Sequence, residues 1–201
     1  MSYYFSVWNG AQIVGAAGSL VINAVLLLAI LTCAYTDTKT GKILNKITFP
    51  AMLAGIILNT AFGVMSGAGL NGLWWSLIGL CVGMAIQWVP YLLSFAKAGD
   101  VKLLMAVGAL KGWAFCSFGF LFGAAAFGFL LVPWLAKRGE LRGVTSNIKN
   151  YFAFAAITQS VPDAPAPTTT RRYVPWGMGL VIGFLIALAM ELLTGRVLWL
   201  R

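Results

Sequence analysis

The chain has 201 residues, of which 60% are hydrophobic and only 9% are charged, and its mean hydropathy is +0.87. This composition excludes an ordinary soluble domain, in which about 25% of the residues are charged. The formal net charge of +9 does not indicate nucleic-acid binding, because the basic residues fall in the gaps between apolar runs and form no basic stripe with interleaved aromatic residues.

The apolar runs predict an all-α integral membrane protein with about six transmembrane helices, since a spanning helix needs roughly 20 apolar residues. The stretch from Val101 to Leu135 is the hardest to divide, because a single helix there would be about 50 Å long and a hydrocarbon core is about 30 Å thick. We therefore expect a tight turn near Gly112. The expected spans cover residues 12–35, 48–66, 73–95, 101–112, 113–136 and 175–194, within one transmembrane domain, 1–201.

Basic residues predict how these spans are oriented, because cytoplasmic loops collect Lys and Arg. With six spans, all three basic clusters lie on one side, which we expect to be the cytoplasm. The loop of about 137–173 lies there too, with a short interfacial helix over 144–155 and a Pro- and Thr-rich linker over 161–170. The clusters are Lys39, Lys42 and Lys46; Lys97 and Lys102; and Lys137, Arg138, Arg142, Lys149, Arg171 and Arg172.

Few residue types are left to carry chemistry, because the chain has no histidine and none of its three cysteines lies in a C-x-x-C pair. A Ser-His or Cys-His nucleophile and a histidine metal site are excluded, and we expect neither a metal nor a cofactor. Of the five acidic residues, Glu140 and Asp163 belong to the polar loop. Glu191, near the end of the last span, is placed to pair with Arg196 or to snorkel to the interface.

Asp37 and Asp100 differ from these residues because each lies where an apolar span meets the cytoplasmic boundary, at the same predicted depth. Each also has a local explanation, since Asp37 would begin a polar turn and Asp100 would cap a helix. Two carboxylates within hydrogen-bond reach share a proton, so that one is a base for water and the other an acid for the leaving amine. Such a pair hydrolyses a peptide bond, and Gly99 would let the substrate backbone come close to Asp100.

Two segments around these aspartates resemble the motifs of the type IV prepilin peptidases, a family of GxGD membrane aspartyl proteases. Residues 37–45, DTKTGKILN, resemble the first Asp of the family with its basic residues and Ile-Pro-Asn, and residues 98–104, AGDVKLL, resemble the Gly-x-Gly-Asp-x-Lys-Leu around the second Asp. Residues 172–175, RYVP, resemble the Pro-Tyr-Ala-Pro that precedes the last span of the family. The resemblance implies catalytic Asp37 and Asp100, and Gly99, Lys39, Lys42, Asn45 and Lys102 as positions that bind substrate or shape the site.

Two positions depart from the family pattern. Lys97 stands at the first Gly of Gly-x-Gly-Asp, and Leu44 replaces the Pro before Asn45. A lysine about three residues from Asp100 is expected to form an ion pair with that carboxylate and to disturb the sharing of a proton.

The resemblance is to the short peptidases associated with tight-adherence (Flp-type) pili. It implies a multi-pass protein of the bacterial cytoplasmic membrane, with its active site facing the cytoplasm, that removes the short basic leader of a membrane-inserted prepilin without methylating the new amino terminus. Its partners would be the prepilin, the lipid bilayer and the pilus assembly machinery, and no nucleic acid. The alternatives are a peptidase for archaeal preflagellins or secretion pseudopilins and, in another class, a non-enzymatic transporter or assembly component.

Overall fold

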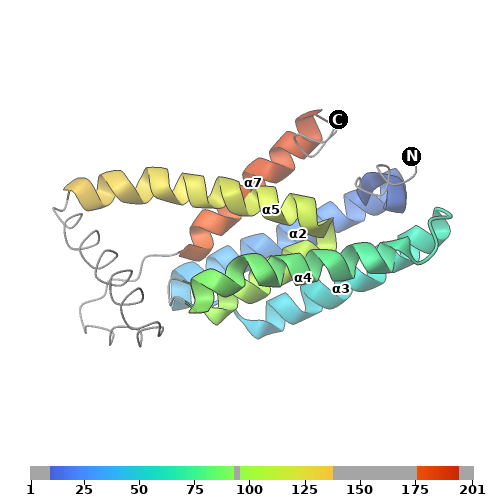
Figure 1. The fold of residues 1–201 in the computed structure, drawn as a ribbon, viewed down its shortest axis with the longest axis horizontal. Coiled ribbons are helices and arrows are strands. Elements are labelled where there is room, and N and C mark those ends of the chain that lie inside the picture. The colour runs from blue at the N-terminus through green and yellow to red at the C-terminus, as the bar shows by residue number, and fades with distance from the viewer. Residues whose placement is uncertain (1–9, 93–95, 138–175, 195–201) are drawn as a thin grey trace, which may run out of the picture.

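The computed structural model describes residues 10–92, 96–137 and 176–194, and within these ranges its regular structure is entirely helical. The predicted all-α fold is thus confirmed. Figure 1 shows α2, α3 and α4 running side by side; α5 packs mainly on α4 and α3, and α7 packs on α5 and α2. The helices are α2 (Gly10–Thr40), α3 (Asn45–Met65), α4 (Asn71–Leu92), α5 (Ala98–Lys137) and α7 (Trp176–Thr194).

Among the described residues, three helical stretches are long and apolar enough to cross a membrane by length and composition, Val14–Thr40, Asn45–Met65 and Ala98–Phe129, although the last is interrupted at Gly112. Gly177–Leu193 is a shorter apolar helix. Large apolar side chains such as Leu28 and Phe129 are more than half exposed, as lipid-facing positions are. The chain is therefore a membrane protein, while the number of six spans stays a prediction. The predicted interfacial helix, the linker, Glu140, Asp163 and residues 172–175 lie outside the described residues.

The helix α2 continues past the end of its apolar run, to Thr40. The polar turn predicted at Asp37 was therefore wrong, and this residue lies in the last turns of the helix. Threonine side chains in this segment bond back to the helix, since Thr36 Oγ1 donates to a carbonyl oxygen three residues back at 3.0 Å and Thr40 Oγ1 to one four residues back at 2.7 Å. Gly41 ends the helix with a φ of 65°, and its N–H donates to the carbonyl oxygen of Asp37 at 2.8 Å.

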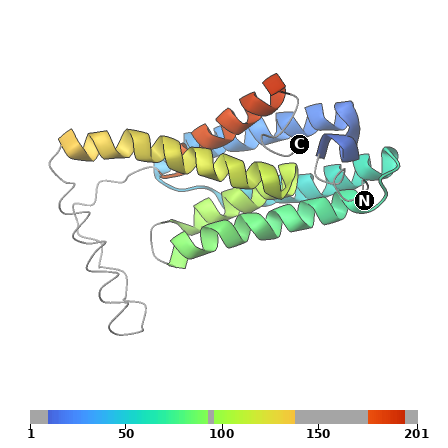
Figure 2. The ribbon, with the colours of Figure 1, turned by 45° about the horizontal axis from the view of Figure 1, so that its top comes forward.

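The helix α5 consists of two arms that meet at Gly112, which confirms the turn expected there. Gly112 has a φ of 81° and a ψ of 176°, and Figures 1 and 2 show the second arm folded back over the first. A Cβ atom at this position would also overlap the indole ring of Trp75, so both conformation and space require glycine. The first arm, 98–111, is only about 21 Å long, which is shorter than a hydrocarbon core of about 30 Å, and the turn that follows it is buried in the bundle.

A turn at membrane depth leaves backbone carbonyl groups without helical partners, and lipid offers no replacement. Two side chains, which we call the turn cap, fill this need: Asn59 of α3 and Ser76 of α4. Asn59 Nδ2 lies 3.0 Å from the carbonyl oxygens of both Ala109 and Leu110, and Ser76 Oγ donates to that of Ala109 at 2.8 Å. Both cap residues are buried, so this polar network stabilises the turn within the bundle.

An ion pair lies beside the same turn. Lys111 Nζ is 2.7 Å from Glu191 Oε1 of α7 and donates to Asn23 Oδ1 of α2 at 2.8 Å. The sequence suggested Arg196 as the partner of Glu191, but Arg196 lies outside the described residues and the structure pairs Glu191 with Lys111. A residue from the turn thus ties α5 to both α2 and α7.

Glycines bring the helices close together. A Cβ atom on Gly79 or Gly108 would overlap the backbone of the other, so α4 and the first arm of α5 touch along their backbones. Gly183 of α7 lies in the same way against Gly119 and Gly123 of the second arm. Close van der Waals packing of this kind is a main source of helix association in lipid, where the hydrophobic effect does not drive it.

Candidate active site

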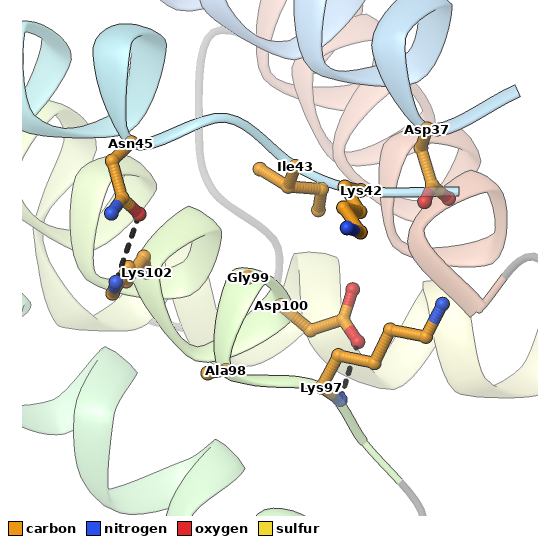
Figure 3. Close-up of a pocket in the computed structure, with 9 residues that line it drawn as sticks. All are labelled: Asp37, Lys42, Ile43, Asn45, Lys97, Ala98, Gly99, Asp100 and Lys102. Carbon is orange, nitrogen blue, oxygen red and sulfur yellow. Dashed lines mark hydrogen bonds between the residues drawn. The ribbon is translucent and has the colours of Figure 1, made fainter. Parts of the chain in front are cut away.

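Asp37 near the end of α2 and Asp100 at the start of α5 line the same cavity, which has a volume of about 280 Å³. Both side chains are buried, with 2% and 4% of their surface exposed. Figure 3 shows their carboxyl groups pointing toward the cavity from two different helices. The other lining residues are Lys42, Ile43, Asn45, Lys97, Ala98, Gly99 and Lys102.

Lys39 is the one predicted site residue that does not line this cavity. Its side chain is exposed, and its ammonium group lies 4.7 Å from the centroid of the Tyr35 ring. The other six predicted residues come together from three helices and from the connection between α2 and α3.

The start of α5 orients Asp100. The sequence suggested that Asp100 is the N-cap residue of this helix, but Asp100 is the third residue of α5. Its Oδ2 accepts a hydrogen bond from the backbone N–H of Lys97 at 2.9 Å, which is the reciprocal half of a capping box. One carboxyl oxygen is therefore held by the backbone of the residue that precedes the helix.

Lys97 links the two segments that carry the aspartates. Its Nζ donates to the carbonyl oxygen of Gly41, at the end of α2, at 2.9 Å. The residue that replaces a family glycine therefore ties the start of α5 to the end of α2. The ion pair expected between Lys97 and Asp100 stays a prediction.

A second lysine makes a similar link to α3. Lys102 Nζ donates to Asn45 Oδ1, at the start of α3, at 2.8 Å, and lies 5.3 Å from the centroid of the Phe49 ring. Figure 3 shows this hydrogen bond beside the cavity. Two motif positions whose role the sequence left open, Asn45 and Lys102, are thus joined by a hydrogen bond between the start of α3 and α5 beside the cavity.

Gly99 packs the first turn of α5 against the connection between α2 and α3. A Cβ atom added to it would lie 2.9 Å from Ile43 Cβ. The space directly beside Gly99 is thus occupied by Ile43, although Gly99 also lines the cavity. Close approach of the substrate backbone at this glycine stays a prediction.

Sequence reasoning missed Gly177, the second residue of α7. A Cβ atom added there would lie 2.6 Å from Asp37 Oδ2. No spacing rule connects two residues so far apart along the chain, and only the packing of α7 on α2 brings them together. The available signal was the position of Gly177 just after residues 172–175, which resemble a family motif.

Fold and site together define a class: a helical membrane protein in which two buried carboxyl groups face one cavity. Residues 24–132 match the type IV leader peptidase family. The match covers more than half of the chain and contains both aspartates, so the protein belongs to this family. No curated protein and no solved structure matches the chain.

Membership of this family makes the protein an aspartic peptidase, and it implies prepilin substrates. The non-enzymatic transporter or assembly component considered from the sequence loses its support. All nine residues that line the cavity lie within the matched region.

Proposed function

We propose that the protein removes the short basic leader of membrane-inserted, Flp-type prepilins by using Asp37 and Asp100 as a catalytic dyad, and that it does not methylate the new amino terminus. The observation that carries this proposal is the shared cavity, because it gives two buried carboxyl groups access to the same substrate bond and the same water. Resemblance of the motif segments to those of the short Flp-type peptidases supports the choice of substrate.

The dyad needs one proton between its two carboxyl groups. The ionised carboxylate takes a proton from water as the water oxygen forms a bond to the scissile carbonyl carbon. The protonated carboxyl group gives its proton to the leaving nitrogen as the C–N bond breaks. After both products leave, one carboxyl group is again protonated and the other ionised, so each turnover consumes one water and one peptide bond.

The location of the cavity supports access from the cytoplasm. Lys42, Lys97 and Lys102 line it, and a lysine-rich helix end is typical of the cytoplasmic side of a membrane protein. Water and the leader would then enter from the cytoplasm, while the hydrophobic segment of the prepilin remains in the bilayer. Cysteine labelling tests this orientation: Lys42→Cys, in a chain from which Cys33, Cys81 and Cys116 have been removed, should not react with an impermeant reagent added to intact cells.

Co-expression with a panel of prepilins tests the substrate. The panel contains an Flp-type prepilin, a secretion pseudopilin and an archaeal preflagellin, and leader removal is read as a shift in size. We expect the Flp-type prepilin to be processed best, and mass spectrometry of its product to show an unmodified amino terminus. Preferred cleavage of another member, or a mass increase of one methyl group, would contradict the proposed substrate or the proposed lack of methylation.

A further inference from the structure

The first turn of α7 lies directly against the carboxyl group of Asp37. A Cβ atom added to Gly177 would be 2.6 Å from Asp37 Oδ2 and 3.1 Å from Asp37 Cγ. Real Cβ atoms essentially never come within 3.0 Å of such atoms, so a larger residue would displace the carboxyl group or the helix. Both residues are buried, and this contact is part of the interior of the protein.

The backbone of Gly177 does not explain why it is glycine. The positive-φ glycines of the described chain are found elsewhere, and Gly177 lies within α7, where alanine is the better helix former. The requirement is space on the side that faces Asp37. The first turn of a helix also presents backbone N–H groups that have no acceptor in their own helix, and it favours negative charge nearby.

The helix α7 is in turn held firmly against α5. The close contact of Gly183 with Gly119 and Gly123 leaves no room for an added Cβ atom. One residue further along, the ring of Phe184 stacks on that of Phe115 with a centroid distance of 6.4 Å. Because α7 is fixed in this way, crowding at Gly177 is relieved most easily by a movement of the Asp37 side chain.

We propose that Gly177 is a positioning residue for Asp37, in that the bare first turn of α7 leaves the room that the carboxyl group of Asp37 needs in order to face the cavity. The inference rests on the proposed role of Asp37 in leader cleavage. Gly177 does not itself line the cavity, so it acts through Asp37 and not on the substrate. An error of about 1 Å in the position of a reacting group can lower a rate about 100-fold.

Gly177→Ala tests the proposal, with Gly179→Ala as a matched control. A Cβ atom on Gly179 would be similarly crowded, 2.9 Å from Phe127 Cβ, but it would be on the side of α7 that faces α5. With purified protein and an Flp-type prepilin, we expect Gly177→Ala to lower kcat between about 10-fold and 100-fold. Its KM should stay within about twofold, because substrate binding is left intact. Gly179→Ala should retain most of the cleavage, and an equal loss in both variants would overturn the proposal.

Thermal stability gives a second readout that does not depend on cleavage. Gly177→Ala should lower the Tm of the protein by at least about 2 °C, and most of this loss should disappear in an Asp37→Ala background, where the crowded atoms are absent. If Gly177→Ala accumulates only in the Asp37→Ala background, that rescue likewise supports the contact between Gly177 and Asp37. Equal penalties in both backgrounds would refute the contact, and coupled stability with normal kcat would refute positioning. Failure of the proposed function looks different, since Asp37→Asn would then itself cleave normally.

Discussion

The two ends of the first arm of α5 use buried polar groups in opposite ways. At the Gly112 end, Asn59 and Ser76 bond to backbone carbonyl groups, and Lys111 pairs with Glu191. At the Asp100 end, two buried carboxyl groups line a cavity of about 280 Å³. Polar residues thus lie inside this membrane protein for two different reasons: at one end they hold the backbone in an unusual shape, and at the other they line the cavity in which we propose that cleavage takes place.

The largest expected effect is at the cavity end, where each aspartate is changed to asparagine. Asp37→Asn and Asp100→Asn should each lower leader cleavage by at least about 10³-fold, because base and acid are needed in the same reaction. The protein should still accumulate, since asparagine preserves the shape of the side chain. The double variant should be scarcely worse than either single variant, as residues that act as a unit are strongly non-additive.

Cleavage of a matched prepilin in membranes, with protein amount measured by blot, decides the matter. Ser76→Ala is a useful control, because it removes a buried polar group from the other end of the same arm and should leave cleavage per molecule intact. Near-normal cleavage by Asp37→Asn or Asp100→Asn, at equal abundance, would remove the dyad mechanism.

At the Gly112 end, we expect a substitution to lower stability without lowering the rate of cleavage. Asn59→Leu removes the amide that lies within hydrogen-bond distance of the carbonyl oxygens of Ala109 and Leu110. Ala109 keeps the hydrogen bond from Ser76 Oγ, but the carbonyl oxygen of Leu110 loses its side-chain partner, and a buried acceptor left without a partner costs about 1–3 kcal/mol. We therefore expect a lower Tm and a lower yield, with kcat of the folded fraction within about threefold of the parent. A normal Tm, or a kcat loss as large as that of Asp100→Asn, would mean that the two ends are not separate in function.

The sequence predicted the helices well, because long apolar runs are required by the bilayer and leave a clear trace. It also predicted the break at Gly112, since an unbroken helix would exceed the hydrocarbon thickness. The end of α2 was predicted too early, because threonine hydroxyls can bond back to the helix and hydropathy does not record this.

Contacts across the bundle were much harder to predict. The family motifs brought Asp37, Asp100, Asn45 and Lys102 into one hypothesis, and the structure places these four around one cavity. Gly177 is one of 23 glycines, and its position just after residues 172–175 does not by itself indicate that it touches Asp37. The turn cap was missed for the same reason, because a polar residue in an apolar run does not reveal which carbonyl group it meets.

The smallest expected effect concerns Lys97, although it lies beside the cavity and departs from the family pattern. The hydrogen bond that orients Asp100 comes from the backbone N–H of residue 97, which Lys97→Gly and Lys97→Met both retain. Each variant loses the hydrogen bond from Lys97 Nζ to the carbonyl oxygen of Gly41. This bond is exposed, and such a bond contributes about 1 kcal/mol to stability. Both should keep cleavage within about threefold, whereas Lys97→Pro, which has no N–H, should lose far more. If Lys97→Met were as inactive as Lys97→Pro, the ammonium group, and not the backbone, would be what Asp100 requires.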